Sequence, residues 1–321
     1  MMSIVWIVIG IILIVYGADA LTDGASALAK RFKISDIVIG LTVVAFGTSA
    51  PELTVTLMSA LKGNADIAIG NVIGSNLFNT LMITGCTAML APIAISRSTL
   101  TREIPLCIVA SLVLIFMAND KLFDGLSYNR IGRTDGLVLL IFFLIFLSYT
   151  FALAKRPGEV QQEGAVVKNM PLWKSVFYIV IGLACLIYGG QCFVDGSVEL
   201  ARLLGVSEAV IGLTLVAAGT SLPELATSMV AAWKKNSDMA IGNVIGSNIF
   251  NIFNVLGVGA TIAPMNVGNI MVVDWIMLLV SALMLLVFGY WGGKRVINRL
   301  EGAILTLTFV GYLAYLIVWK G

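Results

Sequence analysis

The sequence predicts an all-α membrane protein with ten transmembrane helices, arranged as two inverted five-helix repeats with broken helices at the midplane. The first observation behind this prediction is composition, because the chain is 59% hydrophobic and only 12% charged. A soluble domain carries roughly 25% charged residues, so we expect this chain to expose its surface to lipid. The other two observations are the number of long apolar stretches and the likeness of the two halves.

A membrane-spanning helix needs about 20 mostly apolar residues. The N-terminal stretch lacks the charged region and cleavage site of a signal peptide, so we expect it to be a retained first helix. The predicted spans of the first half are 4–29, 36–61, 67–91, 104–118 and 135–154. Those of the second half are 174–201, 208–232, 239–263, 271–291 and 301–319.

The two halves carry the same sequence pattern. A shift of 172 residues aligns DIAIGNVIGSNLFN (66–79) with DMAIGNVIGSNIFN (238–251), identical at 12 of 14 positions. The predicted domains are a first repeat over 1–154, a cytoplasmic linker over 155–173 and a second repeat over 174–321. Five is an odd number of spans, so the second repeat enters the membrane from the opposite side. Inverted repeats of this kind are typical of secondary transporters, which bind substrate near the midplane.

The distribution of charge predicts the orientation and excludes some functions. With both termini outside, 14 of the 20 Lys and Arg residues fall on inner segments, as the positive-inside rule requires. We therefore expect a multi-pass protein of the cell (inner) membrane. A net charge of +2 without a basic arm argues against a nucleic-acid partner.

Neither histidine nor cysteine is expected to form a functional site in this chain. The chain has no histidine, which excludes His-based metal sites, His proton relays and Ser-His-Asp triads. Its four cysteines lie in apolar runs without C-x-x-C spacing, so we interpret them as reduced packing residues: Cys86, Cys107, Cys185 and Cys192.

Two matching segments place a carboxylate inside apolar sequence. AFGTSAPELTVTLMSA (45–60) contains Glu52, and AAGTSLPELATSMVAA (217–232) contains Glu224. The proline before each glutamate lacks an N–H and interrupts the helix. In lipid such a break is tolerated only where the freed groups face protein or a polar cavity.

The residues around each break are rich in oxygen. Thr48 and Ser49 precede Glu52 by four and three residues, so they lie on its side of the helix. Carboxylate, hydroxyl and carbonyl oxygens suit Ca²⁺, which takes about 6–8 of them, and also Na⁺. A carboxylate at the bilayer centre costs roughly 2.5–3.5 kcal/mol. We therefore interpret both glutamates as cation ligands; the alternative is a helix-end residue that reaches water.

Other acidic residues lie toward the ends of the first and sixth spans, where we expect them to be solvated: Asp19, Asp23, Asp195 and Glu199. The second repeated motif, G-N-V-I-G-S-N-x-F-N, has a polar residue every four positions. Its two stripes are Asn71, Ser75 and Asn79, and Asn243, Ser247 and Asn251. Interhelical hydrogen bonding could explain any single asparagine. A whole stripe beside a buried carboxylate favours the lining of an ion passage.

G-T-S-x-P-E and G-N-x-x-G-S-N, present once per half, resemble the α-repeats of the cation/Ca²⁺ exchanger superfamily, in its prokaryotic sodium/calcium antiporter branch. The resemblance covers essentially the whole chain, and the short connector is similar to that of compact prokaryotic members. It implies a secondary active transporter that exchanges Na⁺ for Ca²⁺ by alternating access. Such a protein is not an enzyme, needs no cofactor beyond the transported ions, and has no evident protein partner.

The same resemblance implies a set of ion ligands. Glu52 and Glu224 would bind both ions, and the backbone carbonyls of Thr48 and Thr220 would join them around Ca²⁺. The remaining ligands are one Na⁺ site from Ala45, Ser49 and Ser75, its symmetry mate from Ala217, Ser221 and Ser247, and a central lining from Asn79 and Asn251. Several exchangers of this family have Asp where this chain has Asn251, which leaves the Na⁺:Ca²⁺ stoichiometry open.

Three other functions are compatible with parts of the sequence. A H⁺-coupled or broader divalent-cation antiporter could use the same two glutamates. An intramembrane enzyme is suggested only by TDGASALAKR (22–31), which resembles the core motif of CDP-alcohol phosphotransferases but lacks the required downstream G-x-x-x-D-x-x-x-D. A passive channel is the third, although an inverted repeat with a broken helix in each half favours alternating access.

Overall fold

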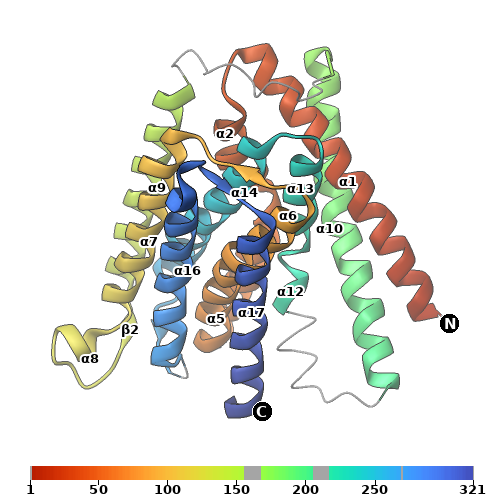
Figure 1. The fold of residues 1–321 in the computed structure, drawn as a ribbon. Helices are drawn as coiled ribbons and strands as arrows, with labels where there is room; N and C mark the ends of the chain where they lie inside the picture. The colour runs from red at the N-terminus through yellow and green to blue at the C-terminus, as the bar shows by residue number, and fades with distance from the viewer. Residues whose placement is uncertain (1, 155–167, 205–216, 269, 321) are drawn as a thin grey trace.

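The structure is a computed structural model that describes residues 2–154, 168–204, 217–268 and 270–320, and these residues are mostly helical (Figure 1). The first half contains α1 (Met2–Phe32), α2 (Asp36–Ile39), η1 (Gly40–Val44), α3 (Ala45–Thr48), α4 (Ala50–Leu61), α5 (Ala65–Leu77), η2 (Phe78–Ile83), α6 (Thr84–Leu90), β1 (Ile93–Ala94), η3 (Thr99–Glu103), α7 (Ile104–Met117), α8 (Asp120–Phe123), β2 (Arg130–Ile131) and α9 (Arg133–Ala154).

The second half repeats much of this order. Its elements are α10 (Leu172–Leu203), α12 (Ala217–Gly219), α13 (Leu222–Trp233), α14 (Ser237–Ile249), η5 (Phe250–Leu256), α15 (Gly257–Ile262), β3 (Met265–Asn266), α16 (Val272–Tyr290), η6 (Trp291–Gly293), β4 (Val296–Ile297) and α17 (Arg299–Lys320). The segments η1, η2, η3 and η5 are π-helical, whereas η6 is a 3₁₀ turn.

The described helices agree with the apolar spans expected from the sequence. Eight are long and apolar enough to cross a membrane, or nine when the bent pair 36–48 and 50–61 is one span. The predicted span 208–232 falls partly outside the described residues, so the count of ten stays a prediction. The linker predicted over 155–173 also lies largely outside the described residues.

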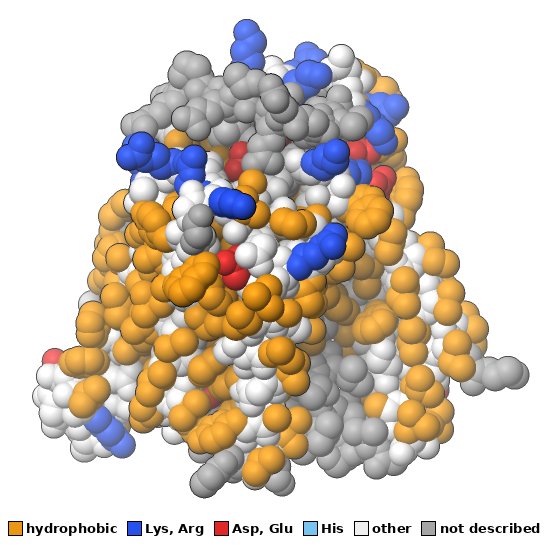
Figure 2. Space-filling view, in the orientation of Figure 1, with side chains coloured by type: hydrophobic (Ala, Val, Ile, Leu, Met, Phe, Trp, Pro, Cys, Tyr) orange, Lys and Arg blue, Asp and Glu red, His pale blue; other side chains and the backbone are white. Residues whose placement is uncertain are grey.

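The apolar helices turn much of their surface outward. In α1, only 28% of the most apolar window is buried, and Ile12 and Tyr16 on this helix are more than half exposed. Figure 2 shows hydrophobic side chains over the middle of the molecule and Lys and Arg side chains gathered toward its upper end. A hydrophobic surface of this extent is stable in lipid rather than water, so the chain is a multi-pass membrane protein.

Helices α1 and α10 lie side by side along one edge of the bundle (Figure 1). Their contacts run antiparallel, because Gly10 meets Gly189 while Gly17 meets Gly182. A Cβ atom added to Gly17 would lie 2.8 Å from the carbonyl oxygen of Gly182. Only glycine permits this approach. By the shift of 172 residues Gly10 corresponds to Gly182 and Gly17 to Gly189, so the same two positions of each half form both contacts.

Short strands connect the two halves at their loops. Strand β1 pairs antiparallel with β4, with Ile93 opposite Ile297, and β2 pairs with β3, with Ile131 opposite Met265. Each pair joins one strand from each half. The sequence pattern did not predict these two-residue strands.

The expectation that Asp23 is solvated was wrong. Its side chain is only 5% exposed, and its two oxygens accept from Lys168 at 2.6 Å and Lys234 at 2.7 Å. The hydrogen bond to Asp23 raises the pKa of Lys168, so the lysine stays charged through neutral pH and its contribution is lost as pH rises through that pKa. By contrast, Asp195 and Glu199 on α10 are exposed, as expected.

Candidate cation site

The candidate site begins at the two helix breaks. The helical segment 36–48 meets α4 at an angle of 47°, with Ser49 between them. Pro51 lies in the first turn of α4, where a missing N–H costs no helical hydrogen bond. In the second half α12 and α13 are separated by Thr220 and Ser221, and Pro223 lies in the first turn of α13. Each predicted proline thus marks the start of a new helix.

The two glutamates that follow these breaks are fully buried. Each shows 0% exposure and is hydrogen-bonded by a serine from the opposite half. Ser221 Oγ donates to Glu52 Oε1 at 2.9 Å, and Ser49 Oγ donates to Glu224 Oε1 at 2.8 Å. Because each serine lies three residues before its own glutamate, these crossed bonds bring the two breaks face to face.

Several oxygen atoms around the breaks remain without a hydrogen-bond partner. Glu52 Oε2 and Glu224 Oε2 are both buried and unpartnered among the described residues. The same holds for the hydroxyl of Ser75 and for Oδ1 of Asn79 and Asn251, whereas the Ser247 hydroxyl approaches the Glu224 carboxylate. Buried polar atoms normally have partners, and a cation bound between the two carboxylates would supply one to each unpartnered Oε2.

The asparagines predicted to line the centre lie in π-helical turns. Asn79 is in η2 and Asn251 is in η5, and both are fully buried. A π-helical turn interrupts regular α-helical hydrogen bonding and is frequent at functional sites. Asn251 Nδ2 donates to Asn76 Oδ1 at 3.2 Å. The side-chain oxygen Oδ1 of Asn251 has no hydrogen-bond partner among the described residues.

Two residues that the sequence interpretation passed over lie in the same region. Asn76 Nδ2 donates to the backbone oxygen of Asn248 at 3.3 Å, and Asn248 Nδ2 donates to Thr80 Oγ1 at 2.7 Å. Asn248 Oδ1 is buried and unpartnered. Both residues are the final Asn of a repeated G-S-N, so their recurrence could have identified them.

Asn71 and Asn243 of the polar stripes make the interhelical hydrogen bonds that the sequence analysis gave as the alternative. Their amides are bonded to the helices that carry the glutamates. Thr48 Oγ1 donates to Asn243 Oδ1 at 3.2 Å and approaches Ala45 O at 3.4 Å. The side chain of Thr220 contacts the Glu52 carboxylate. Ala217 begins α12, and its side chain lies outside the description.

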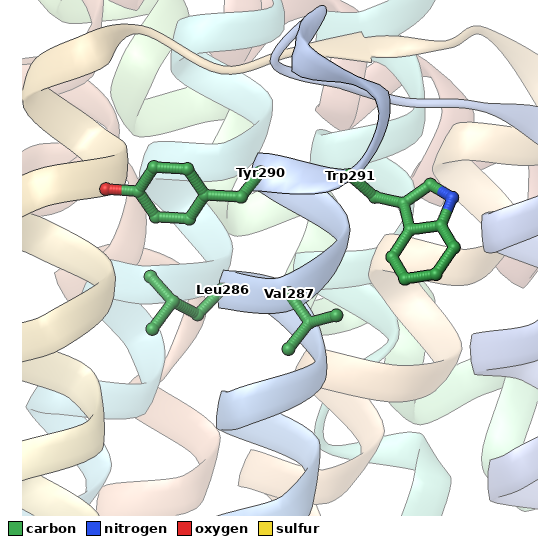
Figure 3. Close-up of a pocket in the computed structure, with 4 residues that line it drawn as sticks. All are labelled: Leu286, Val287, Tyr290 and Trp291. Atoms are coloured by element: carbon green, nitrogen blue, oxygen red, sulfur yellow. The ribbon is translucent and has the colours of Figure 1, made fainter.

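A surface pocket lies at the C-terminal end of α16 and the start of η6 (Figure 3). It is lined by Leu286, Val287, Tyr290 and Trp291, and the last two are 55% and 67% exposed. Tyrosine and tryptophan are enriched where a membrane meets water. The pocket is therefore part of the lipid-facing surface, and none of its lining residues belongs to the candidate cation site.

The fold is that of a multi-pass membrane protein whose centre holds buried carboxylate, hydroxyl and amide groups. The family described as "Sodium/calcium exchanger protein" matches residues 2–152 and 174–318. The chain therefore belongs to the sodium/calcium exchanger family, whose members are transporters rather than enzymes.

Individual relatives are similar over nearly their whole length. The putative antiporter CaxA of Alkalimonas amylolytica is 38% identical over 97% of this chain and 98% of its own. The sodium/calcium exchanger MaX1 of Methanosarcina acetivorans is 32% identical over 97% of each chain. Among solved structures, the sodium-calcium exchanger NCX_Mj superposes with a TM-score of 0.80 at 33% identity, covering 98% of each chain. The prediction of the superfamily and of its prokaryotic branch is confirmed.

Proposed function

We propose that this protein exchanges Na⁺ for Ca²⁺ across the membrane by alternating access, through one site that both halves build. The observation that carries the proposal is the pair of crossed hydrogen bonds, in which each serine binds the glutamate of the other half. Each carboxylate keeps one oxygen without a partner. One cation centre between the halves would use both of these oxygens at once.

The charge and chemistry of the site support Ca²⁺ and Na⁺ as cargo. Two carboxylates would balance one Ca²⁺ or two Na⁺. The surrounding atoms are hydroxyl, amide and carbonyl oxygens, which hard cations prefer. The proposed ligands are Glu52, Glu224, Ser49, Ser221, Ser75, Ser247, Asn79, Asn251 and the backbone carbonyls of Thr48, Thr220, Ala45 and Ala217. Relatives named as sodium/calcium exchangers support the choice of these two ions.

Alternating access follows from the proposed arrangement of the halves as inverted repeats, 1–154 and 174–321. Helices α4 and α5 recur 172 residues later as α13 and α14, and the glycines of α1 that contact α10 have the same offset from their counterparts. Two related halves that meet at one site can open it to either side by rocking against each other. The gathering of Lys and Arg away from both chain ends supports the proposed orientation with the termini outside (Figures 1 and 2).

Reconstitution of the purified protein into liposomes tests the function. Ca²⁺ uptake is measured under outward gradients of Na⁺, K⁺ and H⁺ in turn, at equal ionic strength. We expect uptake with the Na⁺ gradient alone. Uptake driven equally by a pH gradient would instead identify the H⁺-coupled antiporter, and uptake without any counter-gradient would identify a channel.

A further inference from the structure

We propose that Asn71 and Asn243 are positioning residues that fasten each ion-binding glutamate to the helix carrying the serine and asparagine ligands. The inference deepens the proposed function, because it assigns roles to two residues outside the ligand set. It starts from hydrogen bonds that are nearly the same in the two halves.

Each asparagine uses one amide nitrogen for two contacts. Asn71 Nδ2 lies 3.2 Å from the backbone oxygen of Glu52 and 3.0 Å from Thr56 Oγ1. Asn243 Nδ2 lies 3.3 Å from the backbone oxygen of Glu224 and 2.9 Å from Ser228 Oγ. An amide NH₂ has two donor hydrogens, so both are consumed by the helix that bears the glutamate.

These contacts are placed where the backbone most needs support. Glu52 and Glu224 lie in the first turns of α4 and α13, directly after the breaks. The N–H groups of a first turn lack the carbonyl partners that they would have in a helix interior, so few backbone hydrogen bonds tie this turn to the helix before the break. The asparagine attaches this turn to the neighbouring helix.

The neighbouring helix carries the other ligands. Asn71 is on α5, four residues before Ser75, and Asn243 is on α14, four residues before Ser247. Residues four apart lie on the same helix face. Each contact therefore sets the separation between a glutamate and the serine with which it shares a cation.

Asn243 also makes a contact that crosses between the halves. Its Oδ1 accepts from Thr48 Oγ1 at 3.2 Å. Thr48 is the last residue of α3, directly before the first break. A single buried side chain thus connects the break of the first half to the glutamate helix of the second.

The test compares Asn71→Ala and Asn243→Ala by calorimetric titration of the purified protein with Ca²⁺. Each should raise the dissociation constant for Ca²⁺ about tenfold, which corresponds to about 1.4 kcal/mol. The number of bound Ca²⁺ should stay unchanged, because both carboxylates remain. Removing one acceptor, with Thr56→Val or Ser228→Ala, should shift the constant in the same direction by less.

Matched controls separate positioning from general damage. Asn236→Ala removes another buried asparagine, which accepts from Met239 N at 3.0 Å and caps α14 away from the glutamates. Thr54→Val removes an exposed hydroxyl that bonds only within α4. Both controls should leave Ca²⁺ affinity at the wild-type value, even where Asn236→Ala lowers thermal stability.

Wild-type affinity in both Asn71→Ala and Asn243→Ala would overturn the assignment, and so would equal losses in the controls. Binding is measured without a coupling ion. A failure of Na⁺ coupling in the flux assay would therefore count against the proposed function and leave this test intact.

Discussion

Replacing either buried glutamate with glutamine should strongly weaken Ca²⁺ binding while keeping the fold. The glutamine of Glu52→Gln keeps one side-chain oxygen, which can accept from Ser221. In the unmodified protein Ser221 Oγ lies 2.9 Å from Glu52 Oε1. It replaces the unpartnered Oε2 with an NH₂ group, which cannot bind a cation. The same reasoning applies to Glu224→Gln, because Ser49 occupies the equivalent place.

The expected size of the loss follows from burial. Both side chains show 0% exposure, so water cannot replace the missing charge. Truncating one partner of a buried, hydrogen-bonded charge pair typically costs about 2–5 kcal/mol. This range weakens Ca²⁺ binding by roughly 30-fold to several thousand-fold, at about 1.4 kcal/mol for each factor of ten.

The assay is thermal unfolding with and without Ca²⁺, followed by Ca²⁺ uptake in liposomes. At a Ca²⁺ concentration 100 times the dissociation constant, the wild type should gain about 2.7 kcal/mol of stability. Both glutamine variants should lose most of this gain, about two thirds of it or more, but unfold cooperatively without ions. Glu199→Gln, an exposed position on α10, is the matched control and should behave as the wild type. If either Glu52→Gln or Glu224→Gln keeps wild-type Ca²⁺ stabilisation and uptake, the shared-site reasoning is refuted.

Three other predictions concern topology, coupling and stability. Single cysteines at the termini should react with an impermeant reagent in intact cells, whereas one at Gly158 should be protected; the reverse pattern would invert the orientation. Since Asn79 and Asn251 are neutral, two Na⁺ should exchange for one Ca²⁺ with little dependence on membrane potential, and Asn251→Asp should increase that dependence. Moving one uncompensated charge across the membrane changes the transport free energy by about 2.3 kcal/mol per 100 mV. Strong voltage dependence of the wild type, in vesicles clamped with K⁺ and valinomycin, would therefore contradict the predicted 2:1 exchange. Asp23→Asn should lower the unfolding temperature, because it removes the negative charge and one of the two oxygens that accept from Lys168 and Lys234, and equal sensitivity to Asp195→Asn would contradict this.

The helices could be predicted because their signal is local. Apolar stretches of sufficient length appear as α1, α5–α6, α9 and the other long helices within a few residues of the expected bounds. The glutamates could also be identified, because a carboxylate in apolar sequence is costly and this one occurs twice. Their full burial agrees with that expectation.

The partners of these residues could not be predicted. Helical periodicity shows that Ser49 lies on the side of Glu52, but not that its hydroxyl binds Glu224 from the other half. It likewise places Asn71 on the polar stripe without revealing that the amide reaches the backbone of α4. The π-helical turns around Asn79 and Asn251 have no periodic signal of their own, since they arise from packing between helices.

Asp23 illustrates the same limit for charge. Its place near the end of a span suggested a solvated residue, yet Lys234 and Lys168 come from segments more than 140 positions away. Tertiary contact alone buried the expected surface charge of Asp23 beneath two partly exposed lysines.

Competition between the two ions at equilibrium tests the central claim most directly. Calorimetric titration of the purified protein with Ca²⁺ is repeated at increasing Na⁺ concentration, with K⁺ replacing Na⁺ to hold ionic strength constant. If both halves build one site for both ions, each chain binds a single Ca²⁺ at this centre, and the apparent dissociation constant rises steadily with Na⁺. Ca²⁺ binding that is unaffected by replacing K⁺ with Na⁺ would contradict the account.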